Sequence, residues 1–357
     1  MKLYQKGIAG KELHFFDSIR RYRRGLGYYL CHFPIRQSFI SVDPNSARDE
    51  KVSVDSTPDY LFKPWVPHNM LETYAAFGHQ ELPIAADLKF VIILRDPIQR
   101  LISWYNMSRN AGWLIPYSHC TQYHMTLYKR GDGKGSKKNA NGESDLNCKG
   151  TFANMVEQMI RMYSHCLHVV AQASQGDQGA VFSLLLAYDW QFIYDTCILG
   201  EDGKINIVLE ALLNGFYSHQ IKHWLQYYSS GQFFLTSLDT FSEDNNSVMK
   251  NLFRFILDND DDVEASREHW NFMENSRQDS HKDDSQLGQE IDVLHVSPEL
   301  SSMLCTFYKP YMDDLTKLIV NFQNSTHEMY GMNVNINLGF QNDIFNYYHR
   351  CNITNYE

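Results

Sequence analysis

The sequence lacks the features by which membrane-spanning, secreted and small metal-binding proteins are usually recognised. No uncharged apolar run approaches the ~18 residues of a membrane-spanning helix, since the longest, from Ala180 to Tyr188, is about half that length. The lysines near the N-terminus are not followed by the apolar stretch of a signal peptide. The 7 cysteines are scattered and form no CxxC pair or other metal-ligand spacing, so no metal site is predicted.

A surplus of positive charge is also missing. Against 42 Asp+Glu there are 32 Lys+Arg, which gives a net charge of −10. Proteins that bind nucleic acid without sequence preference are normally basic, so no nucleic-acid partner is expected, and an anionic ligand needs a local basic site. The motifs GxSxG, HExxH, GxGxxG and GxxxxGK[ST] are absent, which argues against a hydrolase, a metalloprotease, a dehydrogenase and an ATPase.

The apolar residues, 43% of the chain, are patterned as in an α/β protein. Short β-branched runs predict three buried strands, at Val52–Val54, Phe90–Leu94 and Phe233–Thr236. Helical spacing of apolar residues predicts helices at 151–163, Val208–Tyr228 and Asn246–Leu257, and a last one that begins at Ser297–Pro298. Strands separated by long helices pair in parallel, so we expect a parallel sheet flanked by helices.

Two polar stretches interrupt this pattern. The glycine- and lysine-rich stretch at about 128–150 is typical of a flexible surface insertion, because it has almost no apolar residue to anchor it. The acidic stretch at about 258–296 predicts a long loop before the last helix.

The most informative segment is 89–105. Arg95 stands at the C-terminal edge of a predicted strand, and Asp96 and Pro97 are suited to cap and begin the following helix. Ser103 lies about two turns into that helix. A guanidinium and a hydroxyl so placed can bind one phosphate at the crevice where α/β sheets bind ligands. The residues alone fit equally well an ordinary strand-to-helix turn whose arginine pairs with a surface acid.

The motif LRDPxxRxxSxY at Leu94–Tyr105 resembles the nucleotide 3′-phosphate motif of the carbohydrate sulfotransferases, which use 3′-phosphoadenosine 5′-phosphosulfate. Further blocks are similar, in the same order, to those of the heparan-sulfate-type members. They are Lys11–Asp17 (KELHFFD), Asp55–Tyr60 (DSTPDY), His223–Leu225 with Gln232–Asp239, and Phe307–Tyr311 (FYKPY). The resemblance covers about residues 11–320, and five blocks in order are far more specific than one.

The resemblance implies a P-loop-like sulfotransferase domain over residues 1–325, followed by a C-terminal tail over 326–357. It implies transfer of a sulfuryl group from 3′-phosphoadenosine 5′-phosphosulfate, the co-substrate, to a hydroxyl of a glycan or proteoglycan such as a glycosaminoglycan, without a metal. It also implies a Golgi-lumen glycoprotein, a type II membrane protein when the N-terminus is complete. Four glycosylation sequons agree with that location, at Asn106, Asn245, Asn324 and Asn352.

The donor site implied by the resemblance contains Arg95 and Ser103, which correspond to the arginine and serine that bind the 3′-phosphate. A polar loop before the last helix usually carries basic residues over the nucleotide, and Arg277 and Lys282 are the candidates here.

The catalytic residues implied by the resemblance lie in the block Lys11–Asp17. Glu12 corresponds to the base that takes the proton from the acceptor hydroxyl, and His14 and Asp17 shape the acceptor pocket. From charge alone, Glu12 would be a solvated carboxylate and His14 could equally be a hydrogen-bonded core histidine.

Two departures from the family leave alternatives open. The lysine of the E-K-T-P block is replaced by Ser56, which carries no charge. The family opens with a strand, a Lys-x-Gly-Thr loop that cradles the 5′-phosphosulfate, and a helix, whereas only Lys6–Gly7 precede Lys11 here. We therefore expect the chain to begin after that element, which makes a non-catalytic nucleotide- or glycan-binding remnant the second hypothesis. A nucleotide kinase relative is a third, against which the HFFD and FYKP blocks argue.

Overall fold

The computed structural model describes residues 12–33, 54–75, 84–110, 152–173, 189–200, 203, 205–257, 296–325, 335–336, 347–348 and 351. The chain divides into two compact units whose segments alternate along the sequence. The first unit is Met1–Ile93, Gln220–Ile291 and Val320–Phe340; the second is Leu94–His219, Asp292–Ile319 and Gln341–Glu357. The predicted insertion at 128–150, the cap Thr151 and nearly all of the predicted loop at 258–296 lie outside the described residues.

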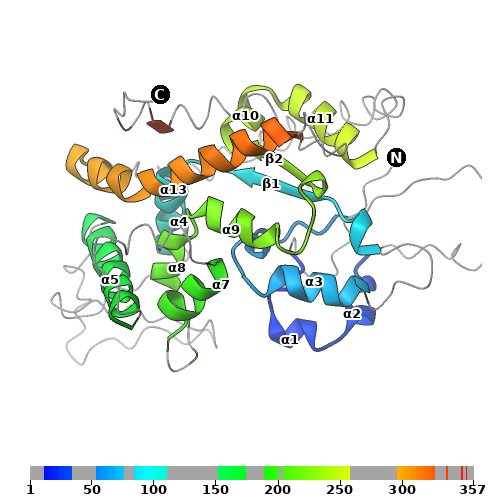
Figure 1. Ribbon diagram of the computed structural model, residues 1–357, viewed down its shortest axis with the longest axis horizontal. Coiled ribbons are helices and arrows are strands. Elements are labelled where there is room, and N and C mark those ends of the chain that lie inside the picture. The colour runs from blue at the N-terminus through cyan, green and yellow to red at the C-terminus, as the bar shows by residue number, and fades with distance from the viewer. Residues whose placement is uncertain are drawn as a thin grey trace, which may run out of the picture. The chain divides into compact units, whose positions relative to one another are not determined.

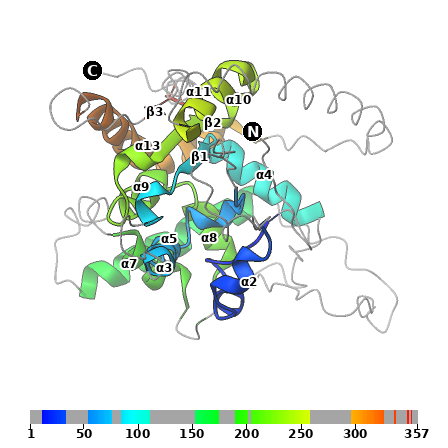
Figure 2. The ribbon, with the colours of Figure 1, turned by 90° about the vertical axis from the view of Figure 1, so that its right-hand side faces the viewer.

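The first unit contains a small sheet, to which Leu94 of the second unit also contributes. Its strands lie in the order β1 (Phe90–Leu94), β2 (Phe233–Ser237) and β3 (Asn335–Ile336) (Figure 2). β2 and β3 are parallel, with Phe234 opposite Asn335. Every residue of β2 is buried, as expected for a strand that is covered on both faces. Strands are confirmed at 90–94 and 233–236. The expectation that the first of them is buried is wrong, because Val91 and Ile93 are 42% and 50% exposed. The strand predicted at Val52–Val54 is absent at Val54, the one of its three residues that the structure describes.

The helices that follow β2 pack against it. They are α10 (Leu238–Glu243) and α11 (Asn245–Leu257), and Figure 1 shows both beside β2. The side chain of Ser237 caps α10 by accepting a hydrogen bond from the Thr240 N–H. Val248 and Phe255 of α11 are buried against Phe234, so the predicted inward face of this helix is confirmed.

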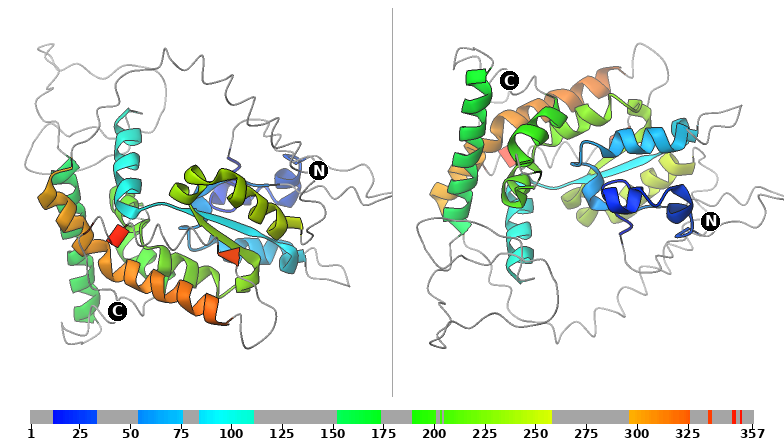
Figure 3. Two further views of the ribbon diagram at one scale, coloured as in Figure 1. Left: turned by 90° about the horizontal axis from the view of Figure 1, so that it is seen from above. Right: turned by 90° about the horizontal axis from the view of Figure 1, so that it is seen from below.

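The N-terminal part of the first unit is built from short helices. Figure 3 shows α1 and α2 next to α3, and the Tyr22 hydroxyl, at the end of α1, donates to the Asn69 carbonyl of α3. The elements are α1 (Ile19–Tyr22), α2 (Leu26–Leu30), the 3₁₀ turns η2 (Pro58–Tyr60), η3 (Ile84–Asp87) and η5 (Ser230–Gln232), and α3 (Val66–Ala75).

The second unit is helical in its described part. Its elements are α4 (Pro97–Asn110), α5 (Phe152–Ala173), α7 (Trp190–Ile193), the π-helical turn η4 (Tyr194–Ile198), α8 (Ile207–Leu213), and the helices that begin in it, α9 (Tyr217–Trp224) and α13 (Pro298–Ser325). In α5 the predicted face is buried at Phe152, Val156, Met159 and Tyr163. Ser297 caps α13 through the Leu300 N–H, as predicted.

The single helix predicted over Val208–Tyr228 is wrong, because the chain forms α8 and α9 with a break at Asn214–Phe216. Gly215 lies in this break, and the side chains of Tyr308 and Pro97 come close to its backbone. A Cβ there would lie 2.6 Å from Cε1 of Tyr308 and 2.9 Å from Cβ of Pro97. A glycine is therefore needed where the end of α8, the start of α4 and α13 meet.

We predict that Gly215→Ala lowers the free energy of unfolding by about 1–3 kcal/mol, because overpacking forces the neighbouring groups apart. Denaturant unfolding followed by circular dichroism measures the change. Gly231→Ala is the matched control, since nothing lies within 4 Å of the Cβ that it would add. Equal stability of the two variants would contradict the close packing of Tyr308 and Pro97 against Gly215.

Within the described part of the second unit, two disulfides are formed. Cys166–Cys197 joins α5 to η4, and Cys305–Cys351 joins α13 to the C-terminal segment. The same segment places the Tyr347 hydroxyl on the Cys305 carbonyl at 3.1 Å and the Tyr348 hydroxyl on Asp313 at 2.8 Å. The expected division into a domain at 1–325 and a tail at 326–357 stays a prediction. Among the described helices, none is both long and apolar enough to cross a membrane.

Candidate active site

The loop at residues 12–17 belongs to the first unit and carries three of the predicted site residues. His14 lies at its centre with a φ of 47°, in the left-handed region that non-glycine residues rarely adopt. The two phenylalanines that follow, Phe15 and Phe16, are each 1% exposed and anchor the loop in the core. The loop therefore presents polar side chains from a rigid apolar base.

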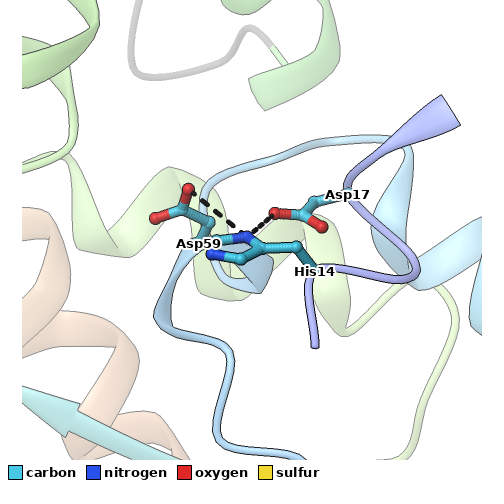
Figure 4. Close-up of side chains that lie close together, drawn as sticks. All are labelled: His14, Asp17 and Asp59. Atoms are coloured by element: carbon cyan, nitrogen blue, oxygen red, sulfur yellow. Dashed lines mark hydrogen bonds and ion pairs between the residues drawn. The ribbon is translucent and has the colours of Figure 1, made fainter. Parts of the chain in front are cut away.

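The imidazole of His14 is surrounded by carboxylates (Figure 4). Its Nδ1 lies 2.7 Å from Oδ2 of Asp17, as Figure 4 shows. Its Nε2 lies 3.1 Å from Oε2 of Glu12, a residue that the figure does not draw. A third carboxylate, of Asp59 in η2, approaches Nδ1 at 3.9 Å. The Asp17 side chain is 6% exposed, whereas Glu12 is 39% exposed. Asp17 is thus placed to orient the ring, and Glu12 remains accessible to a substrate.

The charge state of His14 follows from these neighbours. Burial alone lowers the pKa of His14, but the hydrogen bond and charge of Asp17, followed by Asp59 and Glu12, outweigh it and raise the pKa above 6.5. When protonated, the ring donates to Asp17 and to Glu12 at the same time. His14 is therefore hydrogen-bonded at both ring nitrogens, at the centre of a cluster of carboxylates.

The same cluster has donor atoms that could hold a metal ion. One atom each of His14, Asp17 and Asp59 lie within 4.8 Å of one another. Asp17 bonds His14 directly, and the Asp59 carboxylate lies 3.9 Å from the same ring nitrogen.

The turn and helix at Arg95–Ser103 belong to the second unit and have the predicted local structure. Asp96 caps α4, since its Oδ1 accepts a hydrogen bond from the Gln99 N–H at 2.9 Å, and Pro97 is the first helical residue. Arg95 is partly exposed and Ser103 is exposed. Both side chains are thus available to a ligand.

The buried side of α4 explains why the outer side is available. Ile98, Leu101 and Tyr105 are no more than 9% exposed, and Ser103 lies off this stripe. The carbonyl of Arg95 accepts a hydrogen bond from the Tyr217 hydroxyl at 2.8 Å, which fixes the backbone at the turn.

Arg100, the second arginine of the motif, has a structural role that sequence reasoning missed. Its guanidinium donates to the Ala211 carbonyl at the end of α8. Burial raises the pKa of Tyr217 to about 12, with the positive charge of Arg100 acting in the opposite direction. Arg100 and Tyr217 therefore support the turn that carries Arg95.

Comparison with known proteins identifies the family. Residues 8–332 match the sulfotransferase domain family, which is most of the chain. The chain belongs to the sulfotransferase family. A crystal structure of a sulfotransferase from Alicyclobacillus acidocaldarius is similar over 89% of this chain and 85% of that chain, with 16% sequence identity and a TM-score of 0.39.

Family membership agrees with the helix-rich α/β fold and its small parallel sheet. It indicates a transferase that moves a sulfuryl group from a sulfate donor to an acceptor.

Of the residues predicted for the site of this sulfotransferase, the structure brings Glu12 and Asp17 into contact with the ring of His14. It places Arg95 and Ser103 on one turn and the helix that follows it. Arg277 and Lys282 lie outside the described residues, as does Lys11.

Asp59 was missed as a neighbour of His14. It occupies the variable position of the family's T-P-x-Y block, so no motif indicated a contact across 45 residues of sequence.

Proposed function

We propose that this sulfotransferase moves a sulfuryl group from 3′-phosphoadenosine 5′-phosphosulfate to a hydroxyl of a carbohydrate acceptor, a glycan or proteoglycan. The observation that carries the proposal is the contact of Glu12 and Asp17 with the two ring nitrogens of His14. These three residues stand where the heparan-sulfate-type block has its catalytic residues. The parallel pairing of β2 and β3 supports the P-loop-like version of the fold.

Glu12 acts as the general base in this mechanism. The acceptor oxygen attacks sulfur, the bond from sulfur to the bridging phosphate oxygen breaks, and the hydroxyl proton passes to the Glu12 carboxylate. His14 orients that carboxylate through Nε2, and Asp17 orients His14 through Nδ1. As in phosphoryl transfer, positioning and electrostatics supply most of the rate enhancement.

The donor is held in this proposal by its 3′-phosphate. The Arg95 guanidinium makes a charge-assisted hydrogen bond to the phosphate, and the Ser103 hydroxyl donates a second hydrogen bond. The fixed turn and the capped start of α4 support this role, because they hold the Arg95 backbone in place. Arg277 and Lys282 stay candidates for the loop over the nucleotide.

The decisive experiment is a transfer assay with donor carrying radioactive sulfur and a panel of partly desulfated glycosaminoglycans. In parallel, calorimetry measures the affinity for adenosine 3′,5′-bisphosphate. We expect labelled glycan and binding in the micromolar range. Binding without transfer to any acceptor would favour the non-catalytic remnant, and neither binding nor transfer would refute both.

We further propose that the protein works in the Golgi lumen. Cys166–Cys197 and Cys305–Cys351 support this location, because disulfides persist in oxidising compartments and are rare in the cytosol. Non-reducing peptide mapping of protein isolated from its source cells, together with fluorescence localisation, tests it. Free thiols at all four positions would contradict the proposal.

A further inference from the structure

The backbone of the 12–17 loop is held by side chains from far along the chain. The N–H groups of residues 13 and 14 both donate to Oγ1 of Thr57, each at 3.1 Å. Those of residues 15 and 16 donate to the hydroxyl of Tyr60, at 3.0 and 3.4 Å. Four successive N–H groups that have no helix or strand to bind are therefore satisfied by two hydroxyls.

Asp55 sets the direction of both hydroxyls. Its Oδ1 accepts the hydrogen of Thr57 at 2.7 Å, and its Oδ2 accepts the hydrogen of Tyr60 at 2.8 Å. A hydroxyl has one hydrogen, so donation to Asp55 leaves the lone pairs of both oxygens facing the loop. Burial raises the pKa of Asp55, whereas the hydrogen bonds from Thr57 and Tyr60 act to lower it.

The segment that carries these residues is itself anchored in the first unit. The Trp224 indole donates to the Leu61 carbonyl at 3.0 Å, and the His223 ring bonds the Pro64 carbonyl at 2.8 Å. The hydroxyls of Thr57 and Tyr60 are thus presented from a fixed support.

The conformation of His14 requires such support. A left-handed non-glycine residue costs on the order of 1 kcal/mol and persists only where the surroundings hold it. The Thr57 hydroxyl binds the His14 N–H directly and the preceding N–H as well. This backbone conformation directs the imidazole toward Asp17 and Glu12.

We propose that Asp55, Thr57 and Tyr60 form a positioning clamp for the reaction. The clamp holds His14 in its left-handed conformation, and through His14 it aims the Glu12 carboxylate. Thr57 and Tyr60 bond the backbone of the loop, and Asp55 bonds these two hydroxyls, so we place the action of all three residues on the loop. The role of the clamp in sulfuryl transfer rests on the function proposed above. Its effect on the conformation of His14 does not depend on that function.

The central variant is Thr57→Val, which keeps the shape of the side chain and removes the hydroxyl. We expect kcat to fall about 10- to 100-fold, since a displacement of about 1 Å at a catalytic group has effects of that size. The KM for the sulfate donor should stay unchanged, and Thr57→Ser should restore most of kcat. Thr73→Val is the matched control, because its hydroxyl donates to the Asn69 carbonyl within α3.

The second readout is the NMR titration of the His14 ring in the free protein, without donor or acceptor. The charged groups that face the ring are Glu12, Asp17 and Asp59, and they hold its pKa above 6.5. In Thr57→Val these contacts loosen, so the His14 pKa should fall toward 6.5. Thr57→Ser and Thr73→Val should keep the value of the unmodified chain.

An unchanged His14 titration together with an unchanged kcat in Thr57→Val would overturn the proposal. If Thr57→Val does not fold, as judged by circular dichroism, Tyr60→Phe gives the same test. Tyr22→Phe is its control, because in the described part of the chain the Tyr22 hydroxyl bonds groups of α3. A protein that transfers sulfate to no acceptor but loses the raised His14 pKa on Thr57→Val would reject the proposed function and keep the clamp.

Discussion

Glu12→Gln should reduce sulfuryl transfer by about 10²- to 10⁴-fold, the range that a general base contributes. Glutamine has nearly the same shape and still accepts a hydrogen bond from protonated Nε2 of His14, so the contact at 3.1 Å can survive. In the proposed mechanism the variant loses the basic oxygen that receives the acceptor proton. We expect kcat to fall while the affinity for adenosine 3′,5′-bisphosphate stays within about twofold.

The control for this experiment is Glu157→Gln in α5. Glu157 is 46% exposed and pairs with Arg161 at 3.7 Å on the surface, a kind of contact that contributes little to stability. Its substitution should change neither transfer nor binding. A Glu12→Gln protein with full activity would end the assignment of Glu12 as the base, and the transfer assay with labelled donor decides the matter.

Arg95→Ala should weaken the binding of 3′-phosphorylated nucleotides by about 1.5–3 kcal/mol, the contribution of a hydrogen bond to a charged group. Arg95 is partly exposed, and its backbone is fixed by Tyr217, so the substitution removes the guanidinium without disturbing the turn. Calorimetry with adenosine 3′,5′-bisphosphate gives the change.

Two comparisons make the Arg95 test specific. Adenosine 5′-phosphate has no 3′-phosphate, so Arg95→Ala should not change its affinity. Arg161→Ala removes a cation whose side chain is 83% exposed on α5, and it should leave both nucleotides unaffected. Equal affinity of Arg95→Ala and the unmodified chain for the bisphosphate would remove Arg95 from the donor site.

The segment around Arg95 could be predicted because its structure is local. A β-branched run, a capping aspartate and a first-turn proline determine β1, the turn and the start of α4 from neighbouring residues alone. The exposed position of Ser103 follows from helical periodicity. The structural role of Arg100 could not be predicted, because the carbonyl that it binds, that of Ala211, is 111 residues away in the sequence.

The break between α8 and α9 illustrates the opposite case. Apolar residues continue at helical spacing through Gly215, and the sequence around it favours one helix. At this break the backbone of Gly215 lies so close to Pro97 and Tyr308 that a Cβ atom would not fit. Such an approach depends on tertiary packing, and local spacing does not report it.

The arrangement of the loop at residues 12–17 was predicted in part. The family resemblance grouped Glu12, His14 and Asp17, and in the structure both carboxylates contact the ring of His14. The hydrogen bonds that the hydroxyls of Thr57 and Tyr60 accept from the loop could not be predicted. A bond between a side chain and a distant backbone group leaves no repeating pattern in the sequence.

The dependence of residues 13–16 on Thr57 and Tyr60 has a consequence for protein engineering. The HFFD block cannot be expected to keep its backbone conformation when it is moved alone. Its N–H groups are bound by side chains of the DSTPDY block, some forty residues downstream. A design that grafts the HFFD block onto another scaffold must include the DSTPDY block in the same relative position. Without it, nothing holds His14 in its left-handed conformation.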